Sequence, residues 1–165
     1  MKKTLLTLIF IVGLSTMSFA QNHNTIKYHG EIEAGYALGV GEDKGDRINV
    51  RTIQGFQIGE WLSTGIGVGA DYYTAADGNI LIPAFLNIKG YYPTYSGINP
   101  YISFNVGYSI GVGDVSDCDG IMWEPAIGVK LKWFKVEAGY SSQNIKYGKA
   151  STTYGGIQLK IGVMF

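Results

Sequence analysis

The last nine residues of the chain, Ile157 to Phe165, place an apolar side chain at every odd-numbered position. Successive side chains of a β-strand point to opposite faces of its sheet, so one face of this segment is continuously apolar. The other face carries Gln158, Lys160 and Gly162. A strand with one lipid-compatible face and one polar face is typical of a transmembrane β-barrel, in which the polar face lines the interior.

The same period of two recurs along the rest of the chain and predicts eight strands in total. It is clearest from Pro100 to Val112, where large apolar residues alternate with serine, asparagine and glycine. We expect strands at about 28–40, 48–58, 62–72, 80–92, 100–112, 121–131, 134–142 and 157–165. These lengths suit tilted strands that cross a bilayer. The predicted fold is an all-β, closed, eight-stranded, antiparallel up-and-down transmembrane β-barrel.

The first 20 residues predict a secretory signal peptide. Lys2 and Lys3 precede an apolar stretch from Thr4 to Leu14, and Ser18-Phe19-Ala20 has the small-x-small form of a cleavage site. We therefore expect residues 1–20 to be removed and residues 21–165 to form one barrel domain in the outer membrane. No later apolar run approaches the length of a transmembrane helix.

Charge and cysteine content argue against a nucleic-acid-binding protein and against a fold held by internal disulfides. Without Lys2 and Lys3, the chain has 11 basic residues against 13 acidic ones, which gives no support for nucleic-acid binding. Cys118 is the single cysteine, so no internal disulfide is expected, and its role is left open.

The connections between the expected strands alternate in character and predict the orientation of the barrel. Segments 41–47, 74–79, 113–120 and 143–151 are polar loops, whereas the turns near 59–61, 93–99 and 132–134 are rich in aromatic residues. Aromatic side chains favour the membrane–water interface, so we expect these turns and both chain ends on the periplasmic side. The expected periplasmic ring comprises Tyr28, Trp61, Tyr91, Tyr92, Tyr95, Tyr101, Trp133, Phe134 and Phe165, and the opposite ring Tyr72, Tyr73, Trp123, Tyr140 and Tyr154.

The inward face of the expected barrel carries both signs of charge. An eight-stranded barrel is narrow enough for side chains to fill, and buried charges are stable there only when they are paired. We therefore predict a structural network of ion pairs in the lumen, formed by Glu31, Glu33, Arg51, Asp71, Lys89, Glu124, Lys130, Glu137 and Lys160. The alternative is a narrow or gated porin-like channel for small solutes.

The chain resembles the family of small eight-stranded outer-membrane barrels that includes the transmembrane domain of OmpA and the OmpX-like proteins. The resemblance covers most of residues 28–165 and is strongest in Gly-Ile-Gly-Val-Gly-Ala-Asp-Tyr-Tyr (65–73) and Glu-Pro-Ala-Ile-Gly-Val-Lys-Leu-Lys (124–132). The last strand also resembles the C-terminal signal read by the barrel assembly machinery, through Leu159, Ile161, Val163 and Phe165. The resemblance implies a monomer in contact with outer-membrane lipids and lipopolysaccharide of a Gram-negative envelope.

Function is less constrained than fold, because this barrel serves many purposes. We expect a structural or surface-interaction role, without a cofactor and without catalysis. A lipid-modifying barrel enzyme would need a base beside a serine nucleophile, and the only histidines are His23 in the polar tail and His29, expected as a polar rim residue.

The exterior loop 113–120 is the one candidate binding site. Asp114, Asp117 and Asp119 supply three carboxylates, but Val115 stands where an EF-hand pattern needs its first ligand, so no metal site is predicted.

A less favoured alternative is a soluble secreted β-barrel that binds an apolar ligand, with its apolar faces turned inward. The many glycines on the polar face argue against it, because a narrow lumen needs small residues and a solvent-exposed face does not.

Overall fold

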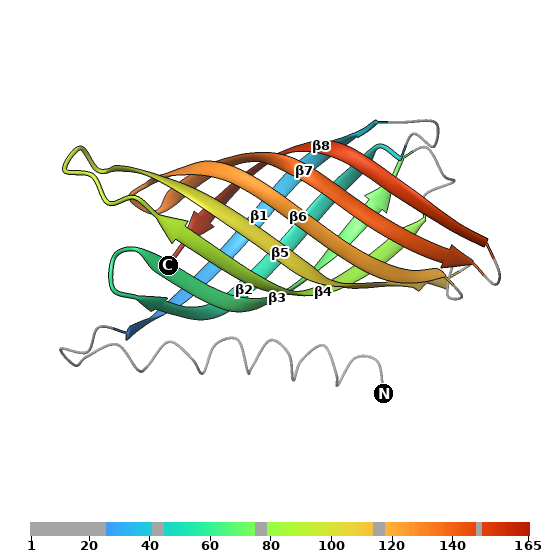
Figure 1. The fold of residues 1–165 in the computed structure, drawn as a ribbon, viewed down its shortest axis with the longest axis horizontal. Helices are drawn as coiled ribbons and strands as arrows, with labels where there is room; N and C mark the ends of the chain where they lie inside the picture. Colours follow the sequence, from blue (N-terminus) through green and yellow to red (C-terminus); the bar gives the residue numbers. More distant parts are fainter. Residues whose placement is uncertain (1–25, 41–44, 75–78, 114–117, 148–149) are drawn as a thin grey trace.

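Eight antiparallel strands close into a barrel in the computed structural model, which describes residues 26–40, 45–74, 79–113, 118–147 and 150–165 (Figure 1). The strands are β1 (Ile26–Val40), β2 (Arg47–Ile58), β3 (Leu62–Tyr73), β4 (Ile80–Tyr91), β5 (Ile98–Val112), β6 (Cys118–Leu131), β7 (Phe134–Tyr147) and β8 (Ala150–Met164). Each strand pairs with the next, and β8 pairs with β1. The predicted fold class is confirmed. The expected signal peptide, residues 1–20, lies outside the described residues.

Within the part of the chain that the structure describes, no helix is long and apolar enough to cross a membrane.

The barrel has two distinct ends. The turn end carries the β2–β3, β4–β5 and β6–β7 turns, the start of β1 and the end of β8. The loop end carries the other four connections (Figure 1). At the turn end, the backbones of Gly30 and Phe165 exchange two hydrogen bonds of 2.7 and 2.9 Å, which continue the β1–β8 pairing to the last residue. The β1–β8 seam that closes the barrel therefore reaches the last residue of the chain.

The β7–β8 hairpin is longer than the sequence pattern predicted. Residues 143–147 and 150–151 belong to strands, so the expected loop 143–151 is wrong there, and the start of β6 at Cys118 shortens the expected loop 113–120. Cross-strand polar contacts extend the hairpin: the Asn144 amide donates to the Thr153 hydroxyl at 3.0 Å, and the Ser151 hydroxyl donates to Asn144 at 2.9 Å. An apolar period does not reveal strands of this kind, because one of their faces carries Asn144, Lys146, Ser151 and Thr153 in place of large apolar residues.

Polarity is inverted relative to a water-soluble barrel. Large apolar side chains cover the outer wall, and among them Ile66, Ile102 and Ile127 are each more than 60% exposed. Ten acidic and basic side chains lie inside and are almost fully buried. The soluble alternative requires the opposite arrangement and is wrong for the described strands.

Part of the interior is apolar, which the sequence reading did not anticipate. Ile53, Phe85 and Met122 form a buried cluster. The three residues belong to one row of register partners that runs across β2 to β6. In this row Gly67 separates Ile53 from Phe85, and Gly107 separates Phe85 from Met122. A Cβ atom on Gly67 would lie against the Phe85 ring, so glycine at this position makes room for the neighbouring aromatic side chain.

Aromatic residues gather at both ends, with exceptions that follow from the alternation of side chains. Trp61, Tyr92 and Trp133 are exposed at the turn end, and Tyr72, Trp123 and Tyr140 are exposed near the loop end. Tyr73, Tyr91 and Tyr101, which were assigned to the two rings, are buried inside the barrel instead. Tyr91 follows the inward Lys89 by two residues and Tyr101 precedes the inward Ser103 by two, so all four share the lumen face.

Candidate functional site

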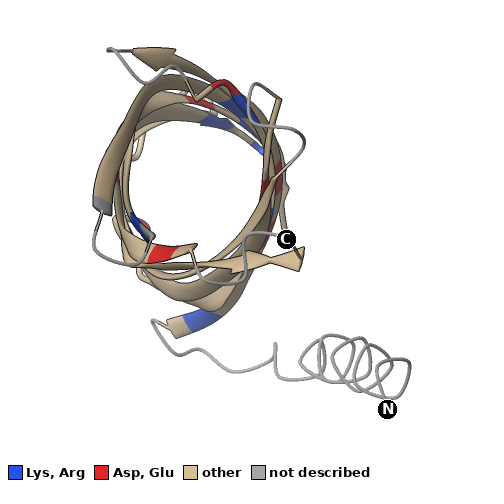
Figure 2. Ribbon diagram, turned by 90° about the vertical axis from the view of Figure 1, so that its right-hand side faces the viewer, with Lys and Arg blue, Asp and Glu red and all other residues tan. Residues whose placement is uncertain are grey.

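The lumen holds the chemically distinctive side chains of this protein. Five carboxylates and five cations are buried there, each at most 1% exposed, and His29 lies beside them at 5%. Figure 2 shows acidic and basic positions distributed around the barrel wall. The ten residues are Glu31, Glu33, Asp71, Glu124, Glu137, Arg47, Arg51, Lys89, Lys135 and Lys160. Because the charges balance, full pairing inside the barrel is chemically feasible.

Glu31 is the centre of the ion pairs nearest the turn end. The Lys89 ammonium donates to both of its carboxylate oxygens at 2.8 and 2.9 Å, and Lys135 donates to Oε2. His29 Nε2 lies 2.7 Å from Glu31 Oε1. His29 is 5% exposed, so the expectation of a polar rim residue is wrong. His29 precedes Glu31 by two residues on β1, so both side chains point into the lumen.

Lys160 joins the turn-end ion pairs to those at mid-height. Its ammonium donates to Glu33 Oε1 at 3.1 Å and lies 2.8 Å from Glu137 Oε1 and 3.7 Å from Glu124 Oε2. The other oxygen of Glu137 accepts hydrogen bonds from the hydroxyls of Tyr101 at 3.0 Å and Ser103 at 3.1 Å. Three carboxylates therefore share one ammonium group, which makes Lys160 the link of the network.

Arg51 bridges two carboxylates that project from opposite parts of the wall. Its Nη2 donates to Asp71 Oδ1 at 3.1 Å and to Glu124 Oε1 at 2.8 Å, and its Nη1 donates to Glu124 Oε2. The guanidinium also lies over the Phe85 ring, 5.3 Å from its centroid. A planar fork that contacts both oxygens of one carboxylate is the strongest geometry for such a pair. This contact reaches across the lumen from β2 to β6.

Lys130 is the one residue of the predicted network that makes no ion pair among the described residues. It lies half-buried with its ammonium 5.5 Å from the centroid of the Tyr91 ring. Its partner in the β6–β7 register is Lys135, which reaches Glu31 and Glu33. Two ammonium groups on adjacent strands repel each other, so one takes the carboxylates and the other turns to an aromatic face.

Two cations of the lumen were missed by the sequence reading. Lys135 sits two residues before Glu137 and shares its face, so the alternation itself could have identified it. Arg47 was placed in an exterior loop, because β2 begins one residue earlier than its apolar pattern suggests. Arg47 donates to the Tyr73 hydroxyl at 3.3 Å and to the Ser141 hydroxyl, and no carboxylate among the described residues pairs with it.

Several buried polar atoms near Arg47 have no hydrogen-bond partner among the described residues. They are Arg47 Nε and both side-chain amide atoms of Asn49 and of Gln158. Ala37 is the register partner of both Arg47 and Gln158, so these side chains flank one small residue on β1. Buried polar groups of this kind are normally satisfied by ordered water. The lumen above Arg51 is therefore suited to hold water.

The exterior candidate site is divided between described and undescribed residues. Asp114 and Asp117 lie outside the described residues. Asp119 lies within β6 and not in a loop, and it accepts a hydrogen bond of 2.5 Å from the Tyr108 hydroxyl. Among the described residues, no group of three or more histidine, cysteine, aspartate or glutamate side chains is arranged to hold a metal ion.

Comparison with solved structures identifies the fold. The chain is similar to Neisserial surface protein A, with a TM-score of 0.63 and 17% identity over 84% of this chain and 97% of that one. It is similar to the outer-membrane enzyme PagL, with a TM-score of 0.62 and 13% identity over 81% and 98%. The N-terminal β-barrel domain of OprF from Pseudomonas aeruginosa matches with a TM-score of 0.52 and 19% identity over 83% and 97%. No family model matches the chain, and no curated protein does.

The chain therefore has the fold of the small eight-stranded outer-membrane barrels. At these identities the likeness concerns the fold alone, and it does not single out the OmpA-like or OmpX-like members that the sequence resembles. The comparison also corrects one expectation. We expected no enzymatic activity, but PagL is an outer-membrane enzyme, so a barrel of this shape is compatible with catalysis.

Proposed function

We propose that this protein is a small integral outer-membrane β-barrel with a structural or surface-interaction role and a lumen closed by ion pairs. The observation that carries the proposal is the inverted polarity, with large apolar side chains outside and a balanced set of charges inside. In water such a wall would expose its apolar area unfavourably. In a bilayer the same wall is solvated by lipid, and closure of the barrel satisfies every strand edge.

The proposal includes a route and an orientation. Residues 1–20 direct export and are removed, and the barrel assembly machinery then recognises the last strand through Leu159, Ile161, Val163 and Phe165. In support, these four side chains all lie on the outer, apolar face of the barrel. The turn end faces the periplasm, and the loop end faces lipopolysaccharide and the exterior. Surface interactions belong to the loop end, including Asp114, Asp117 and Asp119.

Gel mobility of the protein from isolated outer membranes tests this proposal. Small outer-membrane barrels resist unfolding by SDS until they are boiled, because every strand is paired on both sides. We expect the protein in the outer-membrane fraction, with an unboiled band that migrates faster than the boiled one. Recovery as a soluble periplasmic protein with a single mobility would refute both the location and the inverted polarity.

A narrow channel is the second candidate, and one observation favours it. The side-chain amides of Asn49 and Gln158 have no hydrogen-bond partner among the described residues, so the loop-end half of the lumen is suited to hold water. Below them, the Arg51 guanidinium and its two carboxylates cross the barrel. A continuous path would need this ion-pair layer to open, which requires the separation of buried charges and is energetically unfavourable.

A further inference from the structure

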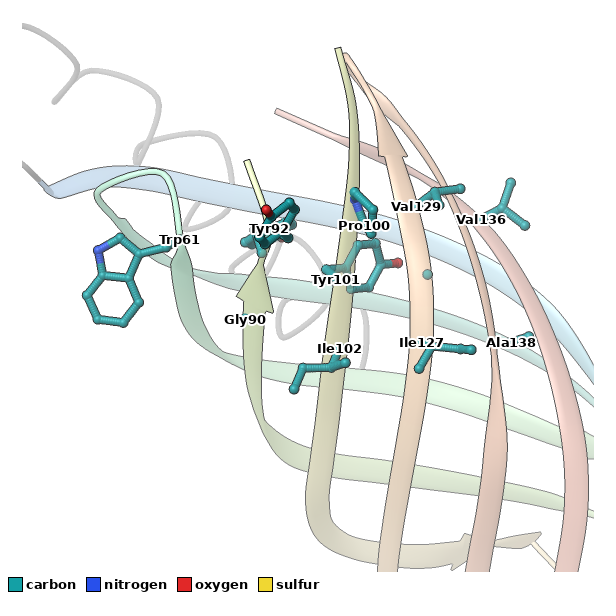
Figure 3. Close-up of a pocket in the computed structure, with 12 residues that line it drawn as sticks. Trp61, Gly90, Tyr92, Pro100, Tyr101, Ile102, Ile127, Val129, Val136 and Ala138 are labelled. Carbon is teal, nitrogen blue, oxygen red and sulfur yellow. The ribbon is translucent and has the colours of Figure 1, made fainter. Parts of the chain in front are cut away.

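A hollow of about 810 Å³ lies on the outer wall of β4 to β7 near the turn end (Figure 3). Trp61, Ile102 and Ile127 are among its lining residues, and none of the 12 is charged. In a bilayer, the acyl chain of any lipid fills an apolar hollow of this kind, so it selects no particular ligand. The polar groups that lack a partner lie inside the barrel, in the lumen.

Arg47 is the one buried cation of the lumen that pairs with no carboxylate among the described residues. The ion-pair contacts of the five buried carboxylates come from Arg51, Lys89, Lys135, Lys160 and His29. Arg47 is 0% exposed, and its two terminal nitrogens donate to the hydroxyls of Tyr73 and Ser141. Its Nε has no hydrogen-bond partner within the described chain. A buried charge without a counterion is energetically costly.

The hydroxyl neighbours of Arg47 do not supply the missing negative charge. Tyr73 donates its own proton to the neutral amide of Gln143. Ser141 donates to Glu124 Oε1 at 2.7 Å, but Arg51 contacts both oxygens of that carboxylate. The charge of Glu124 is therefore directed to Arg51, and the guanidinium of Arg47 keeps an uncompensated charge.

Two buried amides lie beside Arg47. Asn49 follows it by two residues on the same face of β2, and Ala37 on β1 is the register partner of both Arg47 and Gln158. Asn49 is 0% exposed and Gln158 is 1% exposed, and neither amide has a partner for its oxygen or its nitrogen among the described residues. Because no hydrogen bond fixes either amide, both can present their NH₂ groups to the space next to Arg47 Nε.

Water and an anion differ in what they offer at this point. Ordered water satisfies the two amides, but it carries no charge to offset the guanidinium. A small anion accepts hydrogen bonds from all three side chains and also offsets that charge. Arg47 and Gln158 stand on strands about 10 Å apart, with only the methyl group of Ala37 between them. A gap of this size between two long side chains suits a single-atom ion better than an organic molecule.

We propose that the lumen binds one halide ion, held by Arg47 Nε and by the side-chain amides of Asn49 and Gln158. The ion supplies the counter-charge that no described carboxylate gives to Arg47. It lies on the loop-end side of the Arg51 ion pairs and completes the charged filling of the barrel. The inference adds a ligand to a lumen that the proposed function treats as filled by side chains alone.

Bromide locates the site directly, because it replaces chloride and scatters anomalously. We expect crystals of the folded wild-type barrel grown in sodium bromide to show one anomalous peak inside the lumen, within contact distance of Arg47 Nε. The peak should be absent from Arg47→Met crystals grown in the same salt. A wild-type lumen without a bromide peak at Arg47 would overturn the inference and leave water as the occupant.

Stability in solution separates a specific site from bromide bound at crystal concentration only. Urea unfolding is compared in sodium chloride and in sodium gluconate at equal ionic strength, since gluconate is too large for the gap. Relative to gluconate, chloride should lower the unfolding equilibrium constant about fivefold more in the wild type than in Arg47→Met, as expected at a chloride concentration about four times Kd. Comparison of the two proteins cancels the general effect of each salt.

Two further variants keep the test decisive if Arg47→Met folds poorly. Gln158→Leu removes one amide at similar volume and should reduce the chloride effect to about twofold. Lys130→Met removes a positive charge near the other end of the barrel and should keep the full effect. Heat-shifted gel mobility first shows that each variant is folded, so a lost chloride effect reports the site. An equal chloride effect in wild type and Gln158→Leu, or its loss in Lys130→Met, would overturn the inference.

Discussion

Replacing Arg51 with methionine is expected to lower the free energy of unfolding by about 3–5 kcal/mol, because it leaves the buried Asp71 without a cation and Glu124 with only the more distant Lys160. Arg51 is the sole cation within ion-pair distance of Asp71 among the described residues, and it contacts both oxygens of Glu124. All three side chains are excluded from solvent. Methionine keeps much of the side-chain volume, so the loss reflects charge and hydrogen bonding and not a cavity.

Arg47→Met is the matched control. Arg47 lies four residues earlier on the same strand and is equally buried, but its described partners are the neutral hydroxyls of Tyr73 and Ser141. Its replacement should lower the free energy of unfolding by about 1–2 kcal/mol, because it removes hydrogen bonds to neutral hydroxyls and leaves no carboxylate without its cation. Urea titration of both variants in lipid vesicles, with linear extrapolation to water, gives the two values. Equal losses of unfolding free energy in the two variants would show that the ion pairs of Arg51 stabilise the barrel no more than the hydrogen bonds of Arg47 do.

Lys135→Met should produce the second large loss, about 3 kcal/mol, again because carboxylates remain buried after their cation is removed. Lys135 donates to both Glu31 and Glu33. We expect a smaller effect than at Arg51, since Glu31 keeps Lys89 and Glu33 keeps Lys160.

Lys130→Met tests the same change at the register partner of Lys135. Lys130 is half-buried and its ammonium lies over the Tyr91 ring, so its loss should lower the free energy of unfolding by only about 0.5–1 kcal/mol. The two variants carry the same substitution on adjacent strands at one height of the barrel. A Lys130 effect equal to or larger than that of Lys135 would contradict the division of roles between the two lysines.

Most of the fold prediction rests on the alternation of apolar and polar side chains along the sequence. A period of two along segments such as Pro100–Val112 identifies a strand and also assigns each side chain to a face. That is sufficient to predict that Glu31, Glu33 and Glu124 point inward while Ile32, Ile66 and Ile127 point outward. The same rule places Lys135 and Tyr101 inside, although the aromatic-ring argument had assigned Tyr101 to the outer surface.

The pairing of charges depends on distances that alternation does not contain. The direct opposition of Lys130 and Lys135 follows from the β6–β7 register, and a sequence pattern does not specify that register. The contact between Arg51 and Glu124 crosses the barrel, so it depends on the diameter and on the stagger of the strands. The loop-end part of β7 and β8 escaped prediction for a different reason, because beyond the apolar belt the outer face of a strand no longer carries large apolar residues.

Single-channel recording in a planar lipid bilayer tests most directly whether this is a membrane-spanning barrel closed by its ion pairs. The protein is first shown to be inserted by its heat-shifted mobility in the same vesicles. We predict no steady conductance for the wild type, because the ion pairs of Arg51 with Asp71 and Glu124 reach across the lumen and solutes could pass only if these buried charges separated. Steady conductance in the nanosiemens range from the folded wild type would contradict the closed lumen and establish the channel instead.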